Sequence, residues 1–245
     1  MEISKLWELC LEFEYGTNLL VEGLDEWMKT KTHNNILDCA CGTGFPALNL
    51  IEKGYNFICS DGSTEMLSKF KSNANKRGIS IQAHCIKWQG LADVYSNAFD
   101  IVFCRGNSLI YADGWDAERA PNENVIFNCL NNFRKCLKPG GVLYVDTTNE
   151  DNLSSLLPEH NAFGPSIINN TKVYLEETVT TDRIKKIRHW ETTLTIDGTT
   201  HRFTRHSYYL SHEKLIRMLH ECTFKQIEKV PIKGEKYAVF TASVN

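Results

Sequence analysis

The 245-residue chain carries 27 lysine and arginine residues against 30 aspartate and glutamate residues, a formal net charge of −3. Apolar residues make up 42% and charged residues 23%, a globular composition that excludes a disordered or fibrous chain. This charge balance provides no attraction to nucleic acid or to an anionic membrane, so neither is an expected partner. The length predicts a single domain over 1–245.

Targeting signals and cysteine usage indicate the compartment. No apolar run reaches the roughly 18 residues that a membrane-spanning helix needs, and the polar, acidic N-terminus is unlike a signal peptide. The nine cysteines form no Cys-x-x-Cys pair, which suits buried thiols in a reducing cytosol. We therefore expect a cytoplasmic protein, as a monomer or a small homo-oligomer.

The first half of the chain predicts a mostly parallel sheet. Apolar residues at helical spacing indicate an N-terminal helical cap over 1–32. Strands are predicted at 36–40, 56–60, 80–85, 99–104 and 141–146, and helices at 46–53, 63–76 and 122–137. Alternation of this kind predicts an α/β core over 33–150 with helices on both faces of the sheet.

The rhythm changes after about residue 165. Segments 171–181, 184–196 and 200–210 are rich in Thr, Val, Ile and Tyr, with turns at 181–182 and 197–198. They predict antiparallel strands inserted into the closing section of the sheet, a β-rich substrate lid over 165–210. A helix at 211–222 and strands at 224–230 and 236–243 close the chain over 211–245.

Two polar features of the chain are interpreted as ordinary. Lys185-Lys-Ile-Arg188 is interpreted as the solvated face of a strand. The eight histidines show no metal-ligand spacing, so no metal is expected.

A glycine turn joins the first predicted strand to its helix, in Asp38-Cys-Ala-Cys-Gly-Thr-Gly44-Phe-Pro46. Gly42 and Gly44 let the backbone turn sharply and approach a ligand without a Cβ in the way. Asp61 closes the second strand, where an acid usually binds the hydroxyls of a ribose. A plain strand–helix turn with a capping aspartate would show the same residues.

Two cofactor classes fit this turn. Gly42-x-Gly44-x-x-Ala47 matches a dinucleotide fingerprint, which makes an NAD(P)-dependent oxidoreductase one candidate. Asp38, four residues before Gly42, disfavours a pyrophosphate but suits an ammonium or sulfonium cation. The Tyr-x-x-x-Lys pair common in dehydrogenases is absent from the sequence. The acid therefore favours S-adenosyl-L-methionine as the cofactor.

These residues resemble the class I S-adenosylmethionine-dependent methyltransferases, and most closely the glycine/sarcosine N-methyltransferase group. The matching stretches are Ile36-Leu-Asp-Cys-Ala-Cys-Gly-Thr-Gly44, Ser60-Asp-Gly-Ser-Thr-Glu-Met66, Phe99-Asp-Ile-Val-Phe-Cys-Arg-Gly-Asn107-Ser, Leu137-Lys-Pro-Gly-Gly141 and Arg205-His-Ser-Tyr208-Tyr209. The resemblance implies a Rossmann-like fold with a mostly parallel seven-stranded sheet and an antiparallel β insertion that acts as a lid.

The resemblance also implies a set of cofactor contacts. They are Ala40, Gly42 and Gly44 around the methionine part, with Asp38 anchoring that turn; Asp61 on the ribose hydroxyls; Gly62, Met66 and Trp88 at the adenine; and Cys104 and Arg105 beside the sulfonium. Met66 and Trp88 also fit the hydrophobic core.

The expected substrate is a small-molecule amine. Methyl transfer to an amine is an in-line displacement, so a site that orients the nitrogen and excludes water supplies most of the rate. Asn107, Tyr111, Arg205 and Tyr208 are the candidate catalytic residues, and Tyr15, Tyr174, Trp115 and Asp116 the candidate substrate-binding residues.

One position departs from the resemblance. Glycine-methylating relatives place an arginine after the fifth strand to bind the substrate carboxylate, and Thr148 stands at that place here. Arg205 or Arg105 could replace that arginine, while the acidic loop 111–118 suits a cationic substrate. A glycine-like zwitterion and a guanidine-containing or cyclic amine therefore both stay open. The sequence is also compatible with an O-methyltransferase and with a non-catalytic methyltransferase-like subunit.

Overall fold

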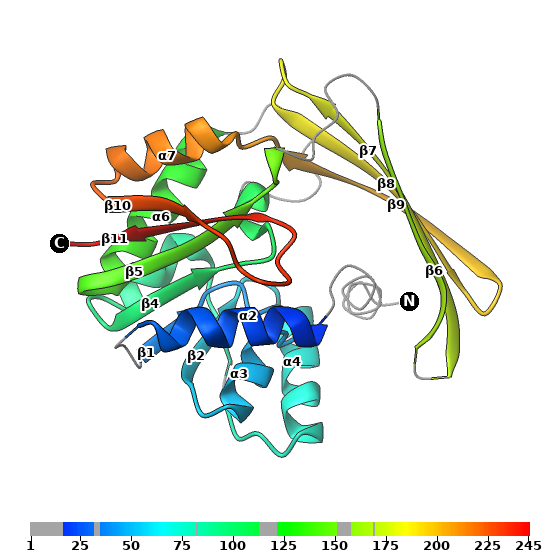
Figure 1. The fold of residues 1–245 in the computed structure, drawn as a ribbon, viewed down its shortest axis with the longest axis horizontal. Coiled ribbons are helices and arrows are strands. Elements are labelled where there is room, and N and C mark those ends of the chain that lie inside the picture. The colour runs from blue at the N-terminus through cyan, green and yellow to red at the C-terminus, as the bar shows by residue number, and fades with distance from the viewer. Residues whose placement is uncertain (1–16, 32–34, 82, 113–121, 151–157, 169) are drawn as a thin grey trace.

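The computed structural model describes residues 17–31, 35–81, 83–112, 122–150, 158–168 and 170–245 (Figure 1). Within these residues, seven strands form one sheet in the order β10-β11-β5-β4-β1-β2-β3. The strands are β1 (Asn35–Asp38), β2 (Asn56–Asp61), β3 (Ala83–Cys85), β4 (Phe99–Cys104), β5 (Leu137–Thr147), β10 (Lys225–Val230) and β11 (Ala238–Ser243). The pairs that β11 makes with β10 and with β5 are antiparallel, and the other pairs are parallel.

The order of the strands creates a switch point beside β1. The chain runs from β1 to β2 and β3 on one side, then returns to place β4 and β5 on the other. In such sheets the crevice outside the carboxyl ends of the strands, at the switch point, is where ligands bind. Acidic residues end three strands at this edge: Asp38 on β1, Asp61 on β2 and Asp146 near the end of β5.

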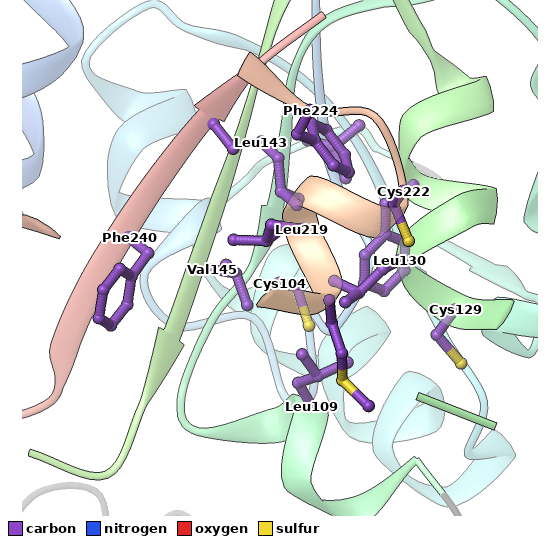
Figure 2. Packing of buried hydrophobic residues seen from close by; sticks show 14 of the residues in the cluster. Cys104, Leu109, Cys129, Leu130, Leu143, Val145, Leu219, Cys222, Phe224 and Phe240 are labelled. Carbon is purple, nitrogen blue, oxygen red and sulfur yellow. The ribbon is translucent and has the colours of Figure 1, made fainter. Parts of the chain in front are cut away.

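Helices cover both faces of this sheet. The helices are α2 (Thr17–Lys29), α3 (Ala47–Glu52) and α4 (Thr64–Lys76) on one face, and α5 (Leu91–Val94), α6 (Glu123–Cys136) and α7 (His212–Glu221) on the other. Alternate residues of β4 enter the two cores: Ile101 and Phe103 pack with the first set, Val102 and Cys104 with the second. Figure 2 shows the second core, where Cys104 lies among side chains of β5, α6 and α7.

The later strands form a sheet of their own. β6 (Glu159–Ile168), β7 (Thr171–Asp182), β8 (Ile187–Ile196) and β9 (Thr199–Tyr208) pair antiparallel in chain order. We call this four-stranded unit the lid sheet; it projects beyond the end of β5 and returns to α7 (Figure 1). The predicted antiparallel β insertion is therefore confirmed, and its strands form a sheet separate from the first one.

The first lid strand was not predicted. β6 contains Gly164-Pro165, which interrupts β propensity, and most of its residues are exposed on both faces. The alternation that marks a half-buried strand is therefore missing from the sequence. Among the residues described, no helix has the length and apolarity required to cross a membrane.

Candidate cofactor and substrate site

The glycine turn after β1 leaves open space at one glycine and close packing at the other. Gly42 has φ +51°, and a Cβ built there meets no atom within 4 Å. Gly44 has φ +112°, and a Cβ there would lie 2.5 Å from Leu48 Cδ1. Both glycines adopt backbone conformations that disfavour other residues, but only Gly42 leaves its backbone accessible to a ligand.

Asp38 ends β1 beneath this turn. Its side chain is 4% exposed, and Oδ1 accepts a hydrogen bond of 3.0 Å from the Ala40 amide. Burial raises the pKa of Asp38 to about 7, against the opposing effects of the Ala40 hydrogen bond and of nearby Arg105. A carboxylate with so little solvent is stabilised by a cation placed beside it.

Asp61 connects the turns after β1 and β2. Oδ2 accepts a hydrogen bond of 2.9 Å from the Gly42 amide, and Oδ1 one of 2.8 Å from the Ser63 amide. Burial raises the pKa of Asp61, while these amides act in the opposite direction. Each carboxylate oxygen accepts more than one hydrogen bond, so the pair is able to bind a diol as well.

The residues predicted at the adenine lie along the next elements. Trp88 donates from Nε1 to the Cys39 carbonyl at 2.5 Å, and its ring packs edge-on against Phe133 at 5.7 Å between centroids. Met66, in the first turn of α4, is 7% exposed. A Cβ on Gly62 would meet only Lys87 Cγ at 3.6 Å.

Cys104 and Arg105 point in different directions after β4. Cys104 is fully buried in the core beneath α6 (Figure 2), so its side chain does not face a ligand at this edge. Arg105 is 6% exposed and donates from Nε and Nη2 to Oε2 of Glu235 at 3.0 and 2.8 Å. Arg105 therefore forms a buried ion pair with the loop before β11, a partner 130 residues away.

Asp146 holds the loop after β4. Its two oxygens accept hydrogen bonds from the Gly106 and Asn107 amides at 2.9 and 2.6 Å. Burial, reinforced by neighbouring Glu235, raises the pKa of Asp146 to about 7. Asp38, Asp146 and Glu235 thus place three buried carboxyl groups around the guanidinium of Arg105.

Asn107 is held in an unusual conformation at this edge. It has φ +55° and ψ +29° and begins the short 3₁₀ helix η2 (Ser108–Tyr111). The side chain is 2% exposed, and Nδ2 donates to Thr148 Oγ1 at 3.2 Å. Oδ1 has no hydrogen-bond partner among the described residues. Tyr111 ends η2 and packs against the core beneath α6.

The structure does not bring the three predicted lid residues together. Arg205 is 5% exposed and donates to Glu177 at 3.2 Å within the lid sheet. Tyr208 is buried at the base of the lid, where its hydroxyl donates to Glu123 at 2.9 Å. Tyr174 alternates with buried Val173 and Leu175 and therefore lies on the opposite face of the lid sheet from Arg205.

Three predicted substrate contacts, Tyr15, Trp115 and Asp116, lie outside the described residues.

Two buried carboxyl groups at this edge were not predicted. Asp146 had a detectable signal, because it lies near the end of a parallel strand as Asp38 and Asp61 do. Glu235 had none, since it follows β10 in a loop far along the chain.

Arg188 departs from the interpretation of Lys185–Arg188 as a solvated face, whereas Lys185 and Lys186 are exposed as predicted. Arg188 is 2% exposed, and Nη2 donates to both carboxylate oxygens of Glu159 at 2.8 and 3.0 Å. Arg188 shares its face of β8 with buried Trp190 and Thr192. The period of two along the strand, and not the run of basic residues, decides its burial.

Comparisons with known proteins relate this chain to methyltransferases. Residues 36–141 match the family model of a methyltransferase domain. The glycine/sarcosine N-methyltransferase of Halorhodospira halochloris is 33% identical over 126 residues, which are 51% of this chain and 44% of that enzyme. The chain thus matches less than half the length of this relative.

Solved structures extend the likeness to the whole fold. DesVI from Streptomyces venezuelae has a TM-score of 0.76 at 13% identity, covering 100% of this chain and 99% of its own. The sugar N-methyltransferase KedS8 from a Streptoalloteichus species has a TM-score of 0.72 at 15% identity, covering 100% and 93%. At these identities the likeness shows the fold.

The fold and the matched domain define the class. Residues 36–141 match a methyltransferase-domain model, and the chain has the class I fold of solved S-adenosylmethionine-dependent methyltransferases. Within that class, its sequence is similar to glycine/sarcosine N-methyltransferases, which confirms the resemblance drawn from its motifs.

The described residues fit S-adenosylmethionine. The open space above Gly42 admits a ligand against the backbone, and Asp61 presents two oxygens beside it. Asp38 and Asp146, the buried carboxyl groups at the ends of β1 and β5, both lie near a single guanidinium, that of Arg105, which is already paired with Glu235. Such an arrangement favours a ligand with a positive charge over a pyrophosphate.

Proposed function

We propose that this protein is an S-adenosylmethionine-dependent N-methyltransferase that acts on a small-molecule amine. The observation that carries the proposal is the buried Asn107 carboxamide at the switch-point edge, whose Oδ1 has no partner among the described residues. Buried polar groups are nearly always hydrogen-bonded, so an oxygen left without a partner beside a binding crevice suits a ligand donor. An amine N–H is such a donor.

Each group of residues has a separate role in this proposal. Asp38 and the Gly42 turn hold the methionine part of the cofactor, and Asp61 binds the ribose hydroxyls. Asn107 Oδ1 accepts an N–H of the substrate, which aims the nitrogen lone pair along the reaction axis. When bound, S-adenosylmethionine supplies a methyl group on a sulfonium, which needs no activation from the protein.

The second part of the proposal concerns which amine is the substrate. Relatives named glycine/sarcosine N-methyltransferase support an amine. The family match ends at residue 141, before Thr148 and the lid sheet, so the half of the chain nearest the substrate lies outside it. A sugar N-methyltransferase shares the fold over both halves, and an amino sugar therefore joins glycine, guanidines and cyclic amines among the candidates.

A methyl-transfer screen with isotopically labelled S-adenosylmethionine tests the function. The panel contains glycine, sarcosine, dimethylglycine, guanidines, cyclic amines and amino sugars, with phenols and carboxylates as the opposing set. We expect label on at least one amine and a loss of turnover in Asn107→Ala with cofactor binding retained. Label on phenols or carboxylates alone would contradict N-methylation, and cofactor binding without any turnover would favour a non-catalytic subunit.

A further inference from the structure

A buried arginine of the lid sheet reaches the end of β5. Arg188 lies on β8, and its Nη1 donates to Thr148 Oγ1 at 3.0 Å. Thr148 directly follows β5 and is itself 7% exposed. The contact therefore joins the lid sheet to the carboxyl edge of the first sheet, at the position where the sequence lacks the arginine of glycine-methylating relatives.

The surroundings of Arg188 fix its guanidinium in one orientation. Glu159 on β6 accepts two hydrogen bonds from Nη2, and Thr181 on β7 accepts one from Nε at 3.3 Å. The guanidinium carbon also lies 4.6 Å from the centroid of the Trp190 ring. A charged group with 2% exposure persists only with such partners, and each of them restricts its movement.

Thr148 passes this constraint to Asn107. Thr148 Oγ1 accepts from Arg188 Nη1 at 3.0 Å and from Asn107 Nδ2 at 3.2 Å. A hydroxyl oxygen has two acceptor positions, so these two donors occupy both and set the rotamer of Thr148. Because Nδ2 is directed at Thr148, Oδ1 on the other arm of the carboxamide points away from it.

We infer that Arg188 is a positioning residue for methyl transfer, acting through Thr148 on the Asn107 carboxamide. Arg188 holds Thr148 Oγ1, Thr148 holds Asn107 Nδ2, and Asn107 Oδ1 is thereby aimed at the substrate amine. This role rests on the proposed N-methyltransferase function. Because Glu159 already pairs with its charge, Arg188 orients the acceptor and does not bind a substrate carboxylate.

Kinetics of matched variants test this role. Arg188→Met and Thr148→Val each interrupt the chain of contacts, and Arg202→Met, an exposed arginine of β9, is the control. We expect kcat to fall ~10- to 100-fold in the first two, because small errors of alignment are costly, with the dissociation constant of S-adenosylmethionine unchanged. The double variant should lose no more than Thr148→Val alone, since that variant already removes the contact with Arg188. Additive losses, or an equal loss in Arg202→Met, would overturn the inference.

Nuclear magnetic resonance separates this inference from the proposed function. The side-chain amide signal of Asn107, assigned by its loss in Asn107→Asp, should shift in Arg188→Met and in Thr148→Val but not in Arg202→Met. Arg188→Lys keeps the charge with fewer fixed donors, so the Asn107 amide signal should lie between its positions in the wild-type protein and in Arg188→Met. An unchanged signal in a folded Arg188→Met protein would overturn the inference, even if no amine substrate were found. A wild-type enzyme that methylates no amine would instead count against the function.

Discussion

Asp38→Asn tests whether the buried carboxyl group at the end of β1 binds the cationic part of the cofactor. Burial raises the pKa of Asp38 to about 7, so about half of the free protein carries a proton there at neutral pH. A cation binds the ionised form and displaces that proton. The affinity of the wild-type protein for S-adenosylmethionine should therefore rise with pH.

The size of this rise follows from the pKa. The ionised fraction of Asp38 increases from about 9% near pH 6 to about 76% near pH 7.5, so the apparent association constant should increase about eightfold. The range stops there because an α-amino group loses its own proton near pH 8. Near pH 7, binding should release about 0.5 proton per cofactor.

Isothermal titration calorimetry in two buffers of different ionisation enthalpy measures both quantities. Asp38→Asn should bind more weakly and lose the pH dependence. Asp146→Asn is the matched control, since burial raises the pKa of Asp146 to about 7 as well but its oxygens are occupied by the Gly106 and Asn107 amides. Asp146→Asn should keep most of the dependence of cofactor affinity on pH. If Asp38→Asn kept the wild-type slope, or affinity fell as pH rose, the reasoning would be refuted.

Three further predictions concern the same edge and the base of the lid. Gly42→Ala should weaken cofactor binding with a small fall in Tm. Gly44→Ala should lower Tm by more, because its Cβ would lie 2.5 Å from Leu48. Differential scanning fluorimetry measures Tm and calorimetry measures cofactor binding, and equal losses of Tm in the two variants would contradict this prediction. Asp61→Ala should raise the dissociation constant at least about tenfold, because a hydrogen bond to a charged group contributes ~1.5–3 kcal/mol; an unchanged constant would remove Asp61 from the site. Glu123 has a pKa lowered to about 2, first by the hydrogen bond from Lys186 and then by that from Lys214. It therefore contributes stability that is complete above about pH 4.5 and is lost as pH falls toward 2. Glu123→Gln should flatten the fall of Tm over that window, and an equally steep fall would argue against the assignment.

Local patterns predicted the first sheet well because its strands and helices are decided by neighbouring residues. Phe99–Cys104 is an apolar run bounded by turns and forms β4 with those bounds. The prediction of the site was limited by contacts between residues far apart along the chain. The Arg105–Glu235 ion pair joins segments 130 residues apart, and no local signal marks its partner.

Burial of polar residues was the harder part to predict. Arg188 follows two lysines, yet the period of the strand places it on the covered face. Tyr174 and Arg205 were grouped by type, although their strand positions put them on opposite faces of the lid sheet. Facing direction depends on register, and register becomes known only when the paired strands are in place.

The chain order of the lid sheet has a consequence for how the protein opens. Each of its strands pairs with the next along the chain, so the unit re-forms through short loops with little entropic cost. Its own cluster of fully buried apolar residues consists of Val173, Leu175 and Leu194, too few for independent stability. The lid sheet should therefore behave as a separate foldon, whose amides exchange with solvent by sub-global unfolding while the strands of the first sheet stay protected.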